Sequence, residues 1–189
     1  MLFRDRTVPA GLKALQSLPV ELITVGPHRE RMAVCTLGRI AGGQVPLICV
    51  AGHHRNMADY AGFANQFRRQ IGEDWPVVLV DLKGRGRSSD RGDKSLYASP
   101  VDAEDLAQIA AALAIERAIF IGQGYGGQVV MALAAHHANL IAGTVLLDAG
   151  PVSDPRGLVR LRNNLRILEG NRSESGFRAM TRRILSTDY

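Results

Sequence analysis

The sequence predicts a three-layer α/β fold in which a mostly parallel sheet is covered by helices. Runs rich in β-branched and apolar residues alternate with segments of helical periodicity. The strand-like runs occupy residues 31–37, 45–51, 76–82, 118–121 and 143–148. The last four runs are continuously apolar, which is typical of strands covered on both faces. Because helices separate these runs, the crossovers favour parallel pairing.

Two helices between these runs are predicted from their N-terminal caps. Residues 57–71 follow Asn56, whose side chain caps helix N-termini well. Residues 101–115 follow Ser99 and Pro100, a cap residue with proline at the first helical position. Each helix is long enough to connect two parallel strands.

The character of the chain changes after Pro151. Leucines recur at helical spacing from 158 to 168 and predict a helix that starts at residue 154 and ends at residue 170. A shorter helix is predicted around residues 173–185. Residues 151–189 hold eight arginines and four acidic residues, which we interpret as solvated helix faces. We therefore expect a core domain over residues 1–152 and a helical segment over residues 153–189.

Composition excludes several classes of protein. The chain has 189 residues, 46% of them hydrophobic, and its net charge of +5 is scattered, so we expect one globular domain and no nucleic-acid partner. Cys35 and Cys49 match no metal-binding spacing, and we expect buried reduced thiols, no metal and no cofactor. Residues 1–15 lack the apolar stretch of a signal peptide, and no run could span a membrane. These features predict a cytoplasmic protein.

A glycine-rich turn at residues 122–127 carries the main functional signal. Its sequence, GQGYGG, follows the apolar run 118–121 and precedes the helical run 128–137. A strand, a tight glycine turn and a helix in this order are typical of the nucleophile elbow G-x-S-x-G. In that register Gly124 occupies the position of the serine.

The same letters also satisfy a dinucleotide-binding motif. Gly122, Gly124 and Gly127 match G-x-G-x-x-G, and Asp148 ends the next apolar run, where a ribose-binding acid is expected. The motif normally follows the first strand of its unit, whereas several strands precede it here. A dinucleotide-binding module therefore stays as the alternative hypothesis.

Four blocks together resemble the α/β-hydrolase superfamily, and they look most like its bacterial members. They are CVAGHHRN at 49–56, VDLKGRGRS at 80–88, the glycine turn, and LLDAGP at 146–151. The order and spacing of the blocks carry the resemblance, because each block alone is weak. The resemblance implies an α/β-hydrolase sandwich with strand order 1-2-4-3-5-6, truncated after the sixth strand, with cap helices over residues 153–189.

The resemblance also implies roles for single residues. The backbone N–H groups of His53 and Tyr125 would form the oxyanion hole beside Gly124, at the nucleophile position. The resemblance also implies a positive φ at Gly124, because the elbow residue of the family normally adopts that backbone conformation. Asp148 ends the sixth strand, where some members of this superfamily place the acid of the triad, whereas others place it after the seventh strand. The pocket would be lined by Gly52, His54 and Gln123.

Two departures from the family pattern predict a pseudoenzyme. Glycine has no atom that can attack a carbonyl carbon, and the late catalytic histidine of the family has no counterpart in this sequence. We expect a degenerate or truncated hydrolase, of ester or similar acyl or C–X hydrolase ancestry, without a working Ser-His-Asp triad. It could still bind a small ligand, use His53 or His54 with Asp148 for proton transfer, or self-associate through the exposed edge of the sixth strand.

Overall fold

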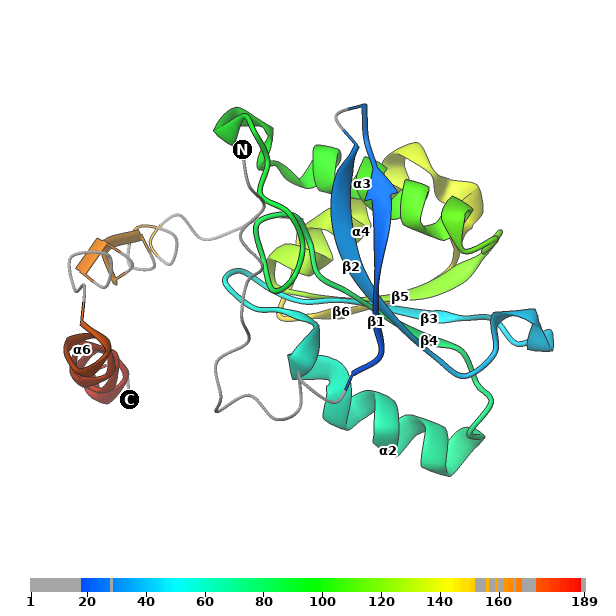
Figure 1. The fold of residues 1–189 in the computed structure, drawn as a ribbon, viewed down its shortest axis with the longest axis horizontal. Coiled ribbons are helices and arrows are strands. Elements are labelled where there is room, and N and C mark those ends of the chain that lie inside the picture. The colour runs from blue at the N-terminus through cyan, green and yellow to red at the C-terminus, as the bar shows by residue number, and fades with distance from the viewer. Residues whose placement is uncertain are drawn as a thin grey trace. The chain divides into compact units, whose positions relative to one another are not determined.

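A single mixed sheet organises the first part of the chain. The computed structural model describes residues 18–27, 29–151, 156, 159, 162–164, 166–167 and 173–187. The sheet has the order β1-β2-β4-β3-β5-β6 (Figure 1), which confirms the predicted order. Strands β4, β3, β5 and β6 are parallel, and β2 is antiparallel to both β1 and β4. The strands are β1 (Val20–Val25), β2 (Glu30–Leu37), β3 (Leu47–Val50), β4 (Val77–Val80), β5 (Ala118–Gln123) and β6 (Ile141–Leu147).

The first strand, β1, is absent from the runs predicted from the sequence. It lies at the edge of the sheet, and Glu21, Leu22 and Thr24 on it are exposed. An edge strand needs no continuous apolar run, because only part of its surface packs on the core. The search for apolar runs therefore missed it.

Helices cover both faces of the sheet, as predicted. The helices are α2 (Ala61–Ile71), α3 (Ser99–Ala112) and α4 (Tyr125–His136), with short 3₁₀ turns η1 (Ile40–Gly42), η2 (Met57–Tyr60), η3 (Lys94–Leu96) and η4 (Ala138–Leu140). Helix α2 lies on one face, and α3 and α4 lie on the other (Figure 1). The Asn56 cap is confirmed, since its Oδ1 accepts the N–H of Ala58 at 2.9 Å. The Ser99 cap is wrong, because Ala98 holds the cap position and Ser99 is already helical.

The core divides into two apolar layers because strand side chains alternate. Ile48 and Val50 of β3 pack in the layer that includes residues of α3 and α4. Leu47 and Cys49 pack in the layer on the α2 side. Cys35 and Cys49 are buried and unpaired, and burial raises the pKa of Cys49 to about 12. The continuously apolar strands β3 and β4 are thus covered on both faces, as predicted.

The chain divides into two compact units, Met1–Pro151 and Val152–Tyr189. In the second unit the structure describes α6 (Glu174–Thr187), which corresponds to the helix predicted around residues 173–185. The helix predicted from residue 154 to residue 170 lies largely outside the described residues. No helix in the described part of the chain is long and apolar enough to cross a bilayer.

Strand β6 differs from the prediction that both its faces are covered. Val145, Leu146 and Leu147 remain 43%, 38% and 43% exposed. The strand pairs with β5 along one edge and is the last strand of the sheet on that side. An apolar run therefore marks a strand, but it does not tell how many faces of that strand are covered.

We propose that the outer edge of β6, which no described strand pairs with, pairs with a second copy of this chain. Its sequence from residue 141 to residue 147 is uncharged, whereas the opposite edge strand β1 carries Glu21. We expect the protein to self-associate in sedimentation velocity, and Val145→Lys to shift it toward monomer. Leu22→Lys, the same kind of change on exposed β1, is the control and should leave association unchanged. A monodisperse monomer for the unmodified chain would contradict the proposal.

Candidate functional site

The glycine turn forms a sharp elbow between β5 and α4. Gly124 lies between them with φ 51° and ψ −115°, so the positive φ predicted for the elbow is observed. Its N–H donates to the carbonyl oxygen of Leu147 at 2.9 Å, which ties the elbow to the end of β6. Its carbonyl accepts the N–H groups of Gly127 and Gln128 at 3.0 and 3.2 Å. These bonds start α4 directly at the turn.

The glycines of the elbow differ in whether the surrounding structure leaves space for a side chain. A Cβ on Gly122 would lie 2.7 Å from the carbonyl oxygen of Gly126, and a Cβ on Gly126 would overlap the carbonyl oxygen of Val50. Both glycines therefore allow α4 to approach the sheet closely. A Cβ on Gly124 would meet nothing within 4 Å. The nucleophile position thus has room for a side chain and carries none.

The loop after β3 lies beside this elbow. A Cβ on Gly52 would be 3.2 Å from the carbonyl oxygen of Gln123. The His53 ring lies 5.3 Å from the Tyr125 ring and 4.7 Å from the His54 ring, in edge-to-face geometry. His54 itself has a positive φ of 55°. The structure therefore brings the residues predicted for the pocket and the oxyanion hole to one edge of the sheet.

Asp148 follows β6 at the same edge. Its φ is 49° and its side chain is exposed. Among the described residues, no histidine forms a hydrogen bond or an ion pair with it. The predicted triad acid is thus near the elbow, but it is not paired with any histidine in the part of the chain that the structure describes.

Asp81 joins the loops that flank the site. One carboxylate oxygen accepts the N–H of Met57 at 2.7 Å, and the other accepts the N–H of Arg87 at 2.9 Å. A Cβ on Gly86, whose φ is 51°, would overlap this carboxylate. Ser88 Oγ donates to the Asp81 carbonyl at 2.6 Å. The block at 80–88 therefore has a structural role: it fixes the loop after β4 against the start of η2.

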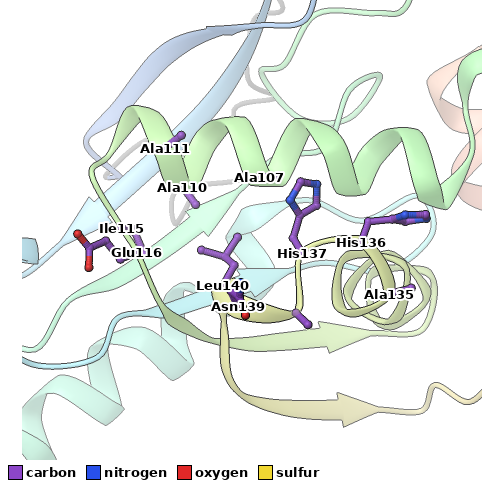
Figure 2. A pocket seen from close by; sticks show the side chains of 11 residues that line it. Ala107, Ala110, Ala111, Ile115, Glu116, Ala135, His136, His137, Asn139 and Leu140 are labelled. Carbon is purple, nitrogen blue, oxygen red and sulfur yellow. The ribbon is translucent and has the colours of Figure 1, made fainter.

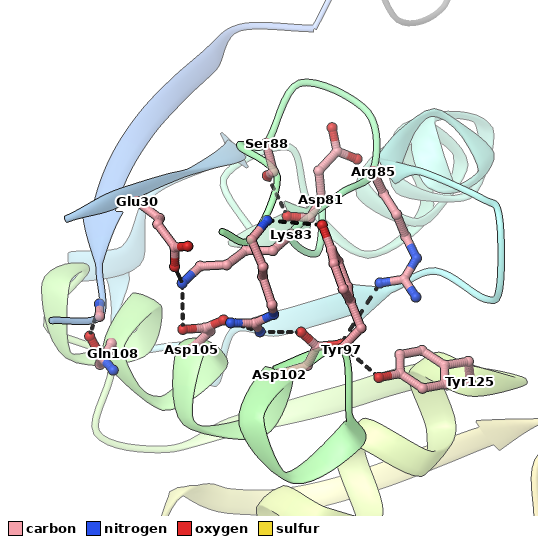
Figure 3. A network of polar contacts seen from close by, with 12 residues as sticks. Glu30, Asp81, Lys83, Arg85, Ser88, Tyr97, Asp102, Asp105, Gln108 and Tyr125 are labelled. Carbon is pink, nitrogen blue, oxygen red and sulfur yellow. Dashed lines mark hydrogen bonds and ion pairs between the residues drawn. The ribbon is translucent and has the colours of Figure 1, made fainter. Parts of the chain in front are cut away.

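The side chain of Tyr125 is held by residues that the sequence analysis did not single out. Its hydroxyl donates to Asp102 Oδ2 at 2.8 Å, and the Arg85 guanidinium lies 4.8 Å from the centre of its ring (Figure 3). Burial, followed by the negative charge of Asp102, raises the pKa of Tyr125. Asp102 and Asp105 share the inward stripe of α3 with Leu106. Acids at core positions of a helix were the signal that could have identified them.

Buried charges continue from Asp102 toward the far side of the sheet. Arg91 donates to Asp102 and, at 2.6 Å, to Asp105. Lys83 lies 3.1 Å from Asp105 and also pairs with Glu30. Negative and positive side chains alternate along this series of ion pairs, and the series ends near Tyr125 (Figure 3). Pairing of this kind offsets the free energy of removing each charge from water.

A cavity of about 510 Å³ lies elsewhere, between α3 and the end of α4 (Figure 2). His136 and His137, at the end of α4, line it. His137 Nε2 lies 3.0 Å from the carboxylate oxygens of Glu104. None of the residues predicted for the elbow site lines this cavity. The elbow, where the motifs meet, therefore stays the candidate site.

Comparisons with known proteins agree with this architecture. Residues 45–166 match the sequence model described as alpha/beta hydrolase fold. The chain is 31% identical to an alpha/beta hydrolase of known structure from Novosphingobium aromaticivorans, with a TM-score of 0.66, over 77% of this chain and 49% of that one.

Two curated relatives are similar over shorter stretches. A 3-hydroxybutyrate-oligomer hydrolase from Cupriavidus necator is 30% identical over 70% of this chain and 43% of its own length. A serine hydrolase-like protein from Danio rerio is 33% identical over 54% of this chain and 30% of its own length. The chain therefore spans less than half the length of each of these proteins.

The environment of His53 predicts a pH-dependent stability. Burial, and then the charges of His54 and Arg85, lower the pKa of His53. Because the unfolded chain then binds the proton more readily, folding loses stability as the pH falls below the unfolded value of about 6.5. The effect should be small, since His53 is more than a third exposed. Urea midpoints from pH 8 to pH 5 should fall less for His53→Gln than for the unmodified chain; parallel curves would contradict the prediction.

Proposed function

This chain belongs to the α/β-hydrolase family, and from that membership we propose that it is a non-hydrolytic member that binds a small ligand. One observation carries the proposal: Gly124 stands at the elbow, with the positive φ of the nucleophile position and open space around its Cα. Covalent catalysis at this position needs an attacking oxygen or sulfur atom. Glycine has neither atom, so residue 124 cannot attack a carbonyl carbon whichever base lies beside it.

Other nucleophiles in the described residues are poorly suited to replace serine. Cys49 lies within β3, fully buried, and the pKa of its thiol is raised to about 12. A thiol held in its neutral form is a weak nucleophile. Tyr125 is adjacent to the elbow, but its hydroxyl already donates to Asp102. We therefore propose that no side chain has taken over the covalent step.

The ligand that fits this site carries an ester, carbonyl or carboxylate oxygen. We assign the N–H groups of His53 and Tyr125 as its two donors, because α4 begins at Tyr125 and leaves that N–H without a helical partner. The positive end of the helix dipole favours a partial or full negative charge there. The Cupriavidus necator relative, by its name, hydrolyses 3-hydroxybutyrate oligomers, which are esters. We also propose that the protein acts in the cytoplasm and binds this ligand without a cofactor.

A dinucleotide-binding function is the second candidate. Strand β5, helix α4 and strand β6 form a parallel β-α-β unit, with Asp148 directly after β6. That arrangement is the one in which the G-x-G-x-x-G motif operates. Thermal melts with NAD or FAD separate the candidates, because a ligand at 100 times its Kd adds about 2.7 kcal/mol to stability. A clear rise in Tm would favour the dinucleotide candidate.

We expect no serine-hydrolase turnover. An activated aryl ester, 4-nitrophenyl acetate, should be hydrolysed no faster than the oxyanion donors alone allow, roughly 10³ to 10⁴ over water in enzymes without a triad. A fluorophosphonate probe should leave the protein unlabelled. Covalent labelling, or ester turnover abolished by a single substitution, would identify a nucleophile and overturn the proposal.

Gly124→Ser should lower stability without creating activity. The backbone at φ 51° and ψ −115° strains any residue with a side chain, so urea melts should show a loss of roughly 1 kcal/mol or more. Gly92→Ser is the matched control, because a Cβ there also meets nothing within 4 Å and its φ is not positive. Equal stability of the two variants would contradict a strained elbow. Any gain of ester hydrolysis would mean that a base reaches residue 124.

A further inference from the structure

The elbow has few side chains of its own to hold it in place. Four of its six residues, from Gly122 to Gly127, are glycines. Glycine has the largest backbone freedom of any residue, and a side chain on Gly124 would touch nothing. Gln123 and Tyr125 are the two residues of the turn that carry side chains. A donor N–H in such a turn needs an anchor from elsewhere in the fold.

Tyr125 is anchored on more than one side. Its hydroxyl donates to Asp102, the Arg85 guanidinium lies over its ring, and the His53 ring packs edge-to-face against it. Asp102 sits in the first turn of α3, and its side chain is only 1% exposed. The hydroxyl of Tyr125 is therefore anchored on helix α3 and not within the turn itself.

Asp102 is itself fixed by the alternating charges. Its second carboxylate oxygen pairs with Arg91, whose side chain is 3% exposed and also binds Asp105. Lys83, whose side chain is 1% exposed, forms ion pairs with both Asp105 and Glu30. A buried carboxylate held by a buried guanidinium has little freedom to move, because separation would leave two unpaired charges. The position of Asp102 is thus determined by residues far from the elbow.

We propose that Asp102 is a positioning residue of the elbow, which acts through the hydroxyl of Tyr125 to fix the Tyr125 backbone N–H. The assignment of that N–H as a ligand donor rests on the proposed function. The positioning itself does not, because it concerns the geometry of the free protein.

The test is hydrogen exchange at the elbow, measured by NMR. The N–H groups of Gly127 and Gln128 donate to the Gly124 carbonyl, so their exchange reports opening of the turn. Tyr125→Phe removes one hydroxyl and no charge, and we expect it to speed exchange of both amides by roughly tenfold, the scale of a lost bond to a charged group. The N–H groups of Leu113 in the α3 cap and His137 in the α4 cap should keep their rates.

Tyr97→Phe is the matched control in the same network. The Tyr97 hydroxyl accepts the N–H of Arg91 at 2.9 Å, and the Tyr97 ring lies 5.8 Å from the Arg91 guanidinium. The Tyr97→Phe variant should leave the exchange rates of the Gly127 and Gln128 amides unchanged.

Asp102→Asn should reproduce the effect of Tyr125→Phe at the elbow, with an added loss of global stability. Tyr125→Phe without faster elbow exchange, or equal acceleration by Tyr97→Phe, would overturn the proposal. Labelling by a fluorophosphonate would overturn the proposed function alone.

Discussion

The close approach of α4 to the ends of β3 and β5 is the constraint on which the site depends. The carbonyl oxygen of Val50 occupies the space that a side chain on Gly126 would need, and Gly126 occupies that of a side chain on Gly122. Helix α4 can therefore start directly at the carboxyl edge of the sheet. Its first N–H groups then point toward the loop that follows β3. Larger residues at either glycine would push the helix away from this edge.

Two separate polar systems fix the loops around that edge. The Asp81 carboxylate binds backbone N–H groups of the loops after β3 and β4, so it holds backbone to backbone. The alternating charges around Asp102 hold side chains, and they end on Tyr125. The hydrogen bonds of Asp81 hold the sequence block at 80–88 against the start of η2. The charges around Asp102 instead link α3 to the elbow. Both systems are largely buried, where a hydrogen bond is electrostatically stronger than it is in water.

At Gly124 the backbone conformation of the elbow is kept, while the atom needed for the covalent step is absent. A nucleophile must stand at a strained backbone conformation so that it projects from the turn, and the surrounding packing must maintain that strain. Glycine adopts the same conformation at little cost. The elbow geometry is thus compatible with binding through backbone donors, while the chemistry of the covalent step is missing. What the fold preserves is the shape of the site.

The sequence by itself determined the parallel sheet, the place of the elbow, the positive φ of Gly124 and the lack of an attacking atom there, because periodicity, turn chemistry and side-chain chemistry are local properties. The tertiary structure decided the edge strand β1, the exposure of β6 and the anchoring of Tyr125. Lys83 and Glu30 pair across 53 residues of sequence, and Tyr125 and Asp102 across 23. Such contacts follow from how helices and strands are placed in space, and no local pattern encodes that placement.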